Sequence, residues 1–181
     1  MEKKEEKKEN NPSKENKEEE EKESEETFEK LKKLLDDNKI TYKLLIHEGG
    51  AKTSEEVAKI RGTPLETGAK AMIIKIDDGF IEVVIPADKK FSSRPAKKFL
   101  KTDCLRFGNK EELFSLTHCI QGSVPPFGSL FGLKTYVDKK LMDKSKYDFI
   151  SFNAGLRTKS FQIKKDDYLK IENPVLCNIC K

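Results

Sequence analysis

The sequence predicts an α+β protein, a single compact domain built on a mixed and largely antiparallel β-sheet. Two features of the pattern support this class. Segments with strand periodicity and segments with helix periodicity follow one another irregularly, and not as the regular strand–helix alternation of a parallel sheet. Residues 69–76 and 80–85 are rich in β-forming residues and are separated only by Asp77-Asp78-Gly79, which is typical of a β-hairpin. A chain of 181 residues is long enough for one such domain and an additional segment.

The additional segment lies at the N-terminus, in residues 1–26. It contains 7 Lys and 12 Glu and, after Met1, no aliphatic or aromatic residue, so its net charge is −5 while the rest of the chain carries +9. Such a segment buries too little apolar surface to offset the entropy of ordering, so we expect disorder; a solvated, transient helix is the alternative. The chain shows no signal peptide, no transit peptide and no apolar run long enough to span a bilayer. We therefore expect a soluble, cytoplasmic protein that does not contact membranes.

Helical periodicity begins at Ser24, where two acidic residues follow as in the first turn of a helix, and ends at Asn38. A short strand is expected at residues 42–46. The segment Thr53-Ser54-Glu55-Glu56 predicts a capping box, with Thr53 as the cap, at the start of a helix that ends at Gly62. Apolar residues recur at helical spacing on the first of these helices and form its core-facing stripe: Phe28, Leu31, Leu34 and Leu35.

The second half of the chain continues the irregular order. A basic helix is expected at residues 93–101, and Asn109 is expected to cap a further helix that runs through Leu116. The remaining expected elements are strands near residues 104–107, 133–137, 149–153 and 160–163 and a short helix at 165–171. The predicted organisation is thus a tail at 1–26, one domain at 27–175 and a C-terminal tail at 176–181.

The segment Gly122-Ser123-Val124-Pro125-Pro126-Phe127-Gly128-Ser129-Leu130-Phe131-Gly132 has the period of neither a helix nor a strand. Its two prolines fix backbone angles, and its three glycines allow close approaches that a side chain would block. It is either an ordered loop whose backbone lies against a ligand or a stiff connection between elements. The pattern alone leaves both interpretations open.

Several kinds of chemistry have no motif in this chain. There is no P-loop, no dinucleotide-binding glycine motif, no H-E-x-x-H and no G-x-S-x-G, and the only histidines are His47 and His118. We therefore expect no metal and no cofactor. Without a secretory signal the cysteines are expected to be free thiols, and a zinc or redox role for the terminal C-x-x-C is a minor alternative. The four cysteines are Cys104, Cys119, Cys177 and Cys180.

Lys70 is the first candidate for a functional side chain. It stands at the start of a predicted strand, and the residues that follow it, 71–74, are apolar. It is either a solvated lysine at a strand edge or a cation aimed at a phosphate or a carbonyl oxygen. The excess of positive charge after residue 26 is either the ordinary charge of a soluble surface or a sign of a polyanionic partner such as RNA.

Five segments, in order and at similar spacing, resemble the YbaK/EbsC family, a domain also found as the editing insertion of bacterial prolyl-tRNA synthetases. The resemblance covers about residues 28–171. Its segments are His47 with Thr53-Ser54-Glu55-Glu56-Val57-Ala58, Gly68-Ala69-Lys70-Ala71-Met72-Ile73-Ile74-Lys75, Gly122 through Gly128, Tyr136-Val137-Asp138, and Phe152-Asn153-Ala154-Gly155.

This resemblance implies a curved mixed sheet flanked by helices and an activity: trans-editing hydrolysis of the ester in a mischarged aminoacyl-tRNA, without a metal. The substrate it implies is proline tRNA carrying cysteine or another small amino acid. Lys70 matches the key lysine of the family, near the ester or the terminal adenosine. The backbone amides around Gly122 and Gly128 would help to hold the ester carbonyl, and a terminal ribose hydroxyl would assist the attacking water.

The resemblance also implies substrate-binding positions. Asn153 departs from the pattern, because many relatives carry an acidic residue or serine there, so the amino-acid specificity stays open. Phe127 either walls a side-chain pocket or packs the loop onto the core. The alternative function is a noncatalytic tRNA-binding or regulatory module associated with an aminoacyl-tRNA synthetase or a multi-synthetase assembly. The substrate-binding candidates are His47, Pro125, Pro126, Phe127, Ser129, Asn153, Ala154 and Gly155.

Overall fold

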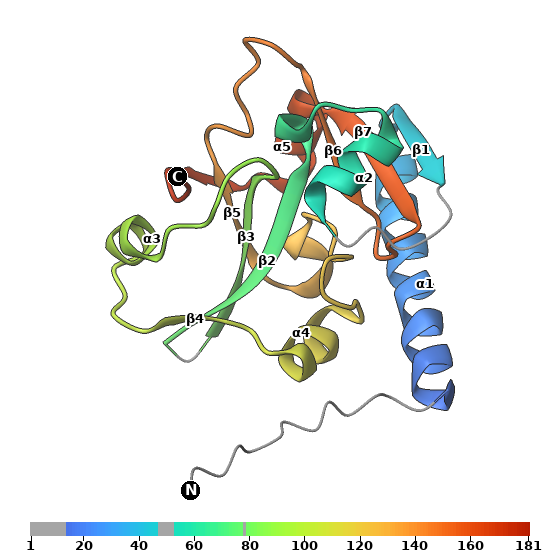
Figure 1. Ribbon diagram of the computed structural model, residues 1–181, viewed down its shortest axis with the longest axis horizontal. Helices are drawn as coiled ribbons and strands as arrows, with labels where there is room; N and C mark the ends of the chain where they lie inside the picture. Colours follow the sequence, from blue (N-terminus) through green and yellow to red (C-terminus); the bar gives the residue numbers. More distant parts are fainter. Residues whose placement is uncertain (1–13, 47–52, 78) are drawn as a thin grey trace, which may run out of the picture.

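The computed structural model describes residues 14–46, 53–77 and 79–181 (Figure 1). His47, a predicted substrate-binding residue, lies outside these ranges. The described residues form helices and two separate β-sheets, which confirms the α+β class. The helices are α1 (Lys14–Asp37), α2 (Ser54–Arg61), α3 (Ser93–Leu100), α4 (Lys110–Thr117) and α5 (Lys165–Glu172), with short 3-10 helices η1 (Leu65–Thr67) and η2 (Gly128–Phe131).

The strands divide into two sheets instead of one curved sheet. The smaller sheet has the order β1-β7-β6 and is antiparallel, and the larger has the order β4-β2-β3-β5-β8. In the larger sheet β3–β5 and β5–β8 are parallel pairs, so this sheet is mixed. The sheets meet where Gly68 forms a parallel bridge with Ser151. The strands are β1 (Tyr42–Ile46), β2 (Ala69–Ile76), β3 (Gly79–Pro86), β4 (Leu105–Phe107), β5 (Lys134–Asp138), β6 (Phe149–Asn153), β7 (Lys159–Lys164) and β8 (Val175–Cys177).

The predicted hairpin and both predicted helix caps are confirmed. Strands β2 and β3 pair from Ala69 opposite Pro86 to Ile76 opposite Gly79. Thr53 and Asn109 each form a capping box with the glutamate three residues later, which satisfies backbone donors that a helix start leaves unpaired. Helix α2 ends at Gly62, whose φ of 64° is left-handed.

Helix α1 packs its apolar stripe against the smaller sheet (Figure 1). Leu31 and Leu35 are fully buried, and the ring of Phe28 stacks on that of Phe161 with 5.7 Å between centroids. Burying a large apolar side chain of this kind contributes about 1.5–3 kcal/mol. This contact fixes α1 to the sheet whose strand β6 carries Asn153.

Helix α1 begins at Lys14, well before the expected start at Ser24. Ser24 is only 3% exposed, and its hydroxyl donates to the carbonyl of His118 at 3.1 Å. Thr27 makes a matching bond to the carbonyl of Thr117. A domain boundary at residue 26 therefore falls inside a packed helix, because small hydroxyl side chains can bury against the end of another helix without any apolar signal.

The C-terminal segment 176–181 is not a tail in the structure. Strand β8 pairs in parallel with β5, and Phe91 forms an antiparallel bridge with Cys180. Asp138 accepts hydrogen bonds from the N–H groups of Ile179 and Cys180. The segment has only six residues, too few for a strand pattern to stand out in the sequence, and the buried carboxylate of Asp138 holds its backbone.

Two acidic side chains lie beneath the segment 122–132. Glu82 on β3 is fully buried, and Glu172 at the end of α5 is nearly so. Glu172 accepts hydrogen bonds from the hydroxyl groups of Ser129 and Thr135, whereas Oε1 of Glu82 has no hydrogen-bond partner among the described residues. Burial, reinforced by the nearby charge of Glu172, raises the pKa of Glu82 well above its usual value.

We expect Glu82→Gln to be more stable than the wild-type protein at about pH 8 and equally stable at about pH 4. A carboxyl whose pKa is raised by folding keeps its proton in the folded state, while the unfolded chain releases it as the pH rises, so raising the pH favours unfolding. The neutral amide removes this penalty. Thermal melts at both pH values test this, with Glu111→Gln on the exposed face of α4 as the control. A stability difference that does not change with pH would contradict it.

Candidate active site

A cavity of about 340 Å³ lies between α2, the start of β2, the beginning of the segment 122–132 and the end of β6. Its described lining includes three cationic side chains, Arg61, Lys70 and Arg157, and no aspartate or glutamate. Asn153 and the backbone of Gly122 complete the polar side of the wall. A cationic cavity without a carboxylate favours an anionic ligand.

Lys70 stands at the cavity end of β2, where it pairs with Ile85 of β3. Its side chain is half-buried, and Nζ donates to the carbonyl of Lys89 at 3.1 Å. Lys70 forms no ion pair with any residue that the structure describes. The ammonium group has three donors, so two of them are available to a ligand in the cavity.

Arg61, the last residue of α2, joins three elements at the cavity wall. Its Nη2 donates to Oδ1 of Asn153 at 2.6 Å, and its Nε donates to the hydroxyl of Ser160 at 2.9 Å. Nδ2 of Asn153 in turn donates to the carbonyl of Gly122. The planar guanidinium fixes the orientation of the Asn153 amide, because Oδ1 must face Arg61 and Nδ2 must face the loop.

Arg61 keeps its positive charge although it is partly buried. Desolvation lowers the pKa of Arg61 to about 10, so the guanidinium remains protonated at neutral pH. Arg61 has hydrogen bonds to neutral partners and no carboxylate partner in the described part of the chain. Its positive charge is therefore uncompensated at the cavity wall.

The loop backbone supplies unused donors beside these cations. Gly122 has a φ of 87°, which a side chain would adopt only with strain, and its carbonyl is held by Asn153. Ser123 donates its N–H to Ile120 and accepts the N–H of Gly155. No hydrogen bond within the described residues uses the N–H of Gly122 or of Val124, and both residues line the cavity. Fixed backbone donors of this kind can stabilise a developing oxyanion.

The structure brings three of the predicted site residues together and separates the others. Lys70, Gly122 and Asn153 line the cavity. Gly128, expected to help hold the carbonyl, is not part of the lining, and its N–H donates to the hydroxyl of Thr135 at 3.1 Å. The remaining described candidates are not among the cavity lining: Pro125, Pro126, Phe127, Ser129, Ala154 and Gly155.

These remaining residues anchor the loop. The ring of Phe127 is fully buried against Phe152 and Tyr168, which agrees with the packing interpretation, and the hydroxyl of Tyr168 donates to the carbonyl of Pro126. Ser129 donates both its N–H and its hydroxyl to Glu172. The loop is thus a rigid support with only its first residues exposed to the cavity.

Arg61 and Arg157 were missed as candidate site residues. Arg61 falls in the last turn of a predicted helix, where a basic residue usually complements the helix dipole. Arg157 follows β6, and its guanidinium donates to the carbonyl of Gln121 at 2.6 Å. Neither position carries a local signal, because both act through partners more than thirty residues away.

Three of the four cysteines show no sign of activation. Burial, followed by the charge of Asp138, raises the pKa of Cys177 to about 12, and burial likewise raises the pKa of Cys180 to about 12 and that of Cys119 to about 11. A thiol is nucleophilic as its thiolate, so these groups are poor nucleophiles. Within the described ranges, no group of three or more His, Cys, Asp or Glu side chains is placed to hold a metal ion. No helix in those ranges is long and apolar enough to cross a membrane.

The fold and the cavity together indicate the class of protein to which this chain belongs. An α+β domain whose cationic cavity offers fixed backbone donors and oriented polar side chains is suited to hydrolysis by positioning and electrostatic stabilisation. The chain belongs to the aminoacyl-tRNA editing domain family, whose model matches residues 48–171. This assignment confirms the resemblance noted in the sequence.

Two similar proteins support the same assignment. The chain is 31% identical over 153 residues to the multifunctional Ser/Thr-tRNA deacylase ProXp-y of Escherichia coli K12, covering 82% of this chain and 90% of the relative. It is 26% identical over 146 residues to the proline–tRNA ligase of Thermosipho melanesiensis, covering 75% of this chain and 25% of that ligase.

Solved structures show the same fold. One, described as a proposed trans-editing enzyme for prolyl tRNA synthetase, superposes with a TM-score of 0.76 at 18% identity over 86% of this chain and 97% of the other. The hypothetical protein APE2540 superposes with a TM-score of 0.75 at 21% identity over 84% of this chain and 99% of the other.

Proposed function

We propose that this protein is a trans-editing deacylase that hydrolyses the ester between a small, wrongly attached amino acid and the 3′ end of a tRNA. The observation that carries this proposal is the arrangement of Lys70, Arg61 and the Gly122–Val124 backbone around one cavity without a described carboxylate. The phosphate-bearing end of a tRNA fits a cationic cavity of this kind. Family membership and the deacylase relative support the reaction class.

We infer a role for each of these groups in the proposed reaction. Water attacks the ester carbonyl carbon, negative charge develops on the carbonyl oxygen, and the bond to the ribose oxygen breaks to release the amino acid. The N–H groups of Gly122 and Val124 and the ammonium of Lys70 stabilise that charge. Asn153 keeps the loop backbone in position through the carbonyl of Gly122. A neighbouring hydroxyl of the terminal ribose assists the water, since no described side chain of the lining is a histidine or a carboxylate.

The lining also favours a small polar amino acid. Thr53, Ser54 and Thr63 contribute to the cavity wall near α2. The hydroxyl of Thr53 is committed to the N–H of Glu56 as a helix cap, whereas no hydrogen bond is recorded for the hydroxyl of Ser54 or of Thr63 within the described residues. Free hydroxyls of this kind can hydrogen-bond a seryl or threonyl side chain. We place serine and threonine ahead of cysteine and alanine, with proline tRNA among the carriers and a prolyl-tRNA synthetase as the partner that produces the error.

A panel of charged tRNAs tests this function. Purified protein is mixed with proline tRNA charged separately with serine, threonine, cysteine, alanine and proline, and with threonine tRNA charged with serine. We expect the seryl and threonyl esters on the wrong tRNA to be cleaved and the prolyl ester to be spared. Binding of tRNA without cleavage of any ester would replace this proposal with the noncatalytic tRNA-binding module.

Arg61→Lys is expected to lower kcat about 10–100-fold with little change in KM, because lysine lacks the rigid planar fork that holds Asn153 and Ser160 in one geometry, and the loop backbone loses its fixed orientation. Single-turnover kinetics on the best ester of the panel measure this. Arg106→Lys, which changes an exposed arginine paired with Glu112, is the matched control. An unchanged kcat in Arg61→Lys would contradict the positioning role.

A further inference from the structure

A run of cations leads away from the cavity. Residues 89–101 contain six Lys or Arg residues and no Asp or Glu. Among the described residues, the only carboxylate that pairs with any of the six is Asp88, which contacts Lys89 at 2.5 Å. Four of the six side chains are exposed: Lys90, Arg94, Lys98 and Lys101.

This run has a rigid backbone. Lys90 exchanges both backbone hydrogen bonds with Lys181, and the N–H of Ser92 donates to the carbonyl of Ile179 at 2.8 Å. Ala96 of α3 is fully buried in an apolar cluster on the larger sheet. The cations are therefore presented on a fixed support, which reduces the entropy lost when a ligand binds.

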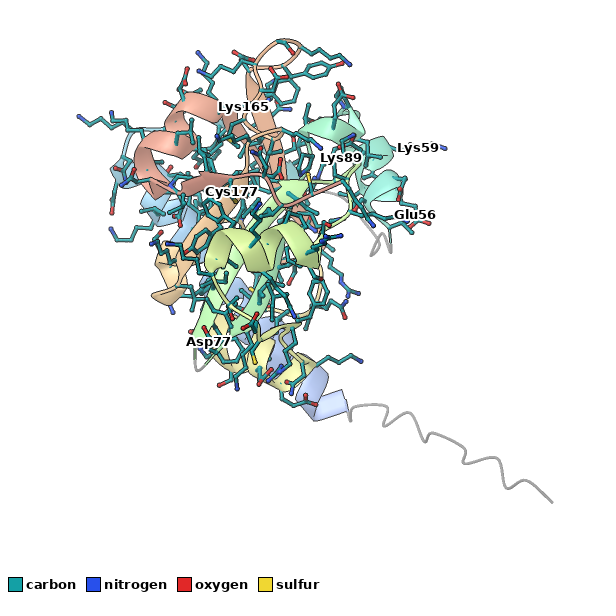
Figure 2. The ribbon with its side chains drawn as sticks, turned by 90° about the vertical axis from the view of Figure 1, so that its left-hand side faces the viewer. Glu56, Lys59, Asp77, Lys89, Lys165 and Cys177 are labelled. Atoms are coloured by element: carbon teal, nitrogen blue, oxygen red, sulfur yellow. The ribbon has the colours of Figure 1, made fainter. Side chains whose placement is uncertain are left out.

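The run begins at the cavity wall. Ala87 lines the cavity, and Nζ of Lys70 donates to the carbonyl of Lys89. Figure 2 shows Lys89 and α3 on the face turned to the viewer, with Asp77 at the far end of the hairpin. A ligand that leaves the cavity past Lys70 therefore meets Lys89 first and α3 next.

We propose that residues 89–101 bind the phosphate backbone of the acceptor arm of the tRNA whose 3′ end enters the cavity. This proposal rests on the proposed function and adds a surface to it. Helix α3 has 8 residues and is therefore about 12 Å long, which is enough for contacts with two or three consecutive phosphates. Phe99 lies between Lys98 and Lys101 in the sequence, and its side chain is 45% exposed. The bases of unpaired nucleotides can stack on an aromatic ring of this kind while the neighbouring cations contact phosphates. An anionic membrane would also attract this charge, but continuity with the cavity favours RNA.

The test compares two triple variants that remove the same charge. Arg94→Gln/Lys98→Gln/Lys101→Gln removes cations of the run, and Lys43→Gln/Lys164→Gln/Lys170→Gln removes exposed lysines of the smaller sheet and α5. Binding of uncharged tRNA is measured by filter binding at several salt concentrations. We expect the first triple to weaken binding at least about tenfold and to reduce the salt slope by about 2–3, and the control triple to change binding less than about threefold.

A second readout separates this proposal from the proposed function. Hydrolysis of an aminoacyl-adenosine, which has no phosphate, is expected to be equal in the wild-type protein and the first triple. If no ester is cleaved, the proposed function fails, while the binding data still decide the role of residues 89–101. Equal loss of tRNA binding in both triples, a loss of aminoacyl-adenosine hydrolysis in the first triple, or binding to anionic vesicles in place of tRNA would overturn the proposal.

Discussion

Lys70→Ala is expected to lower kcat/KM for the cleaved ester by about 100- to 1000-fold while the Kd for uncharged tRNA changes less than about threefold. Lys70 supplies one cation beside the carbonyl oxygen, and its contribution grows as charge develops in the transition state. The rest of the tRNA contacts lie elsewhere, so ground-state binding is largely retained. Single-turnover hydrolysis and filter binding on the same preparation measure both quantities.

Lys75→Ala is the matched control for this variant. Lys75 lies on the same strand β2, close to the hairpin turn and five residues from Lys70, and its ammonium lies over the ring of Phe80. The control is expected to keep full activity. Equal losses in Lys70→Ala and Lys75→Ala would show a general effect on the strand and would remove Lys70 from the site.

Gly128→Val is expected to destabilise the fold by about 3 kcal/mol. A Cβ at this position would lie 2.9 Å from the carbonyl oxygen of Leu133 and would overlap the hydroxyl of Thr135, neither of which can move freely. The loop pattern alone predicts that this change damages activity more than stability. The structure reverses that expectation, since Gly128 is buried and is not part of the cavity lining.

Urea unfolding tests this prediction against a glycine in open space. Gly79→Ala places its Cβ where no atom lies within 4 Å, and its φ is outside the left-handed region, so a small change is expected. A Gly128→Val protein with wild-type stability and no activity would restore the direct role in substrate binding that the sequence suggested.

Local signals predicted most of the fold. The hairpin follows from two β-rich runs around a tight turn, and both capping boxes follow from four-residue patterns, so each is determined by neighbours in the chain. The resemblance to a known family placed Lys70, Gly122 and Asn153 at one site, and the cavity contains all three. The order of the motifs along the chain was enough to identify these three positions.

The parts that sequence reasoning missed depend on contacts between distant residues. Strand β8 pairs with β5, and Asp138, about forty residues earlier, holds the backbone that follows it at Ile179 and Cys180. Arg61 is held at the cavity wall by Asn153, ninety-two positions away, and by Ser160, ninety-nine positions away. Gly128 resembled a ligand-binding glycine, whereas its tight neighbours are Leu133, just before β5, Thr135 on β5 and Glu82 on β3. A pattern of neighbouring residues in one sequence does not reveal contacts between residues so far apart in the chain.

We infer that the ester binds between Lys70 and the Gly122–Val124 backbone. A crystal structure with a non-hydrolysable analogue, a seryl group joined to the 3′ position of adenosine through an amide, would show this directly. We expect the carbonyl oxygen of the analogue to accept a hydrogen bond from the N–H of Gly122 or Val124, with Nζ of Lys70 on the same side. An analogue bound outside this cavity, or bound within it with its carbonyl turned away from the loop, would rule out this position for the ester.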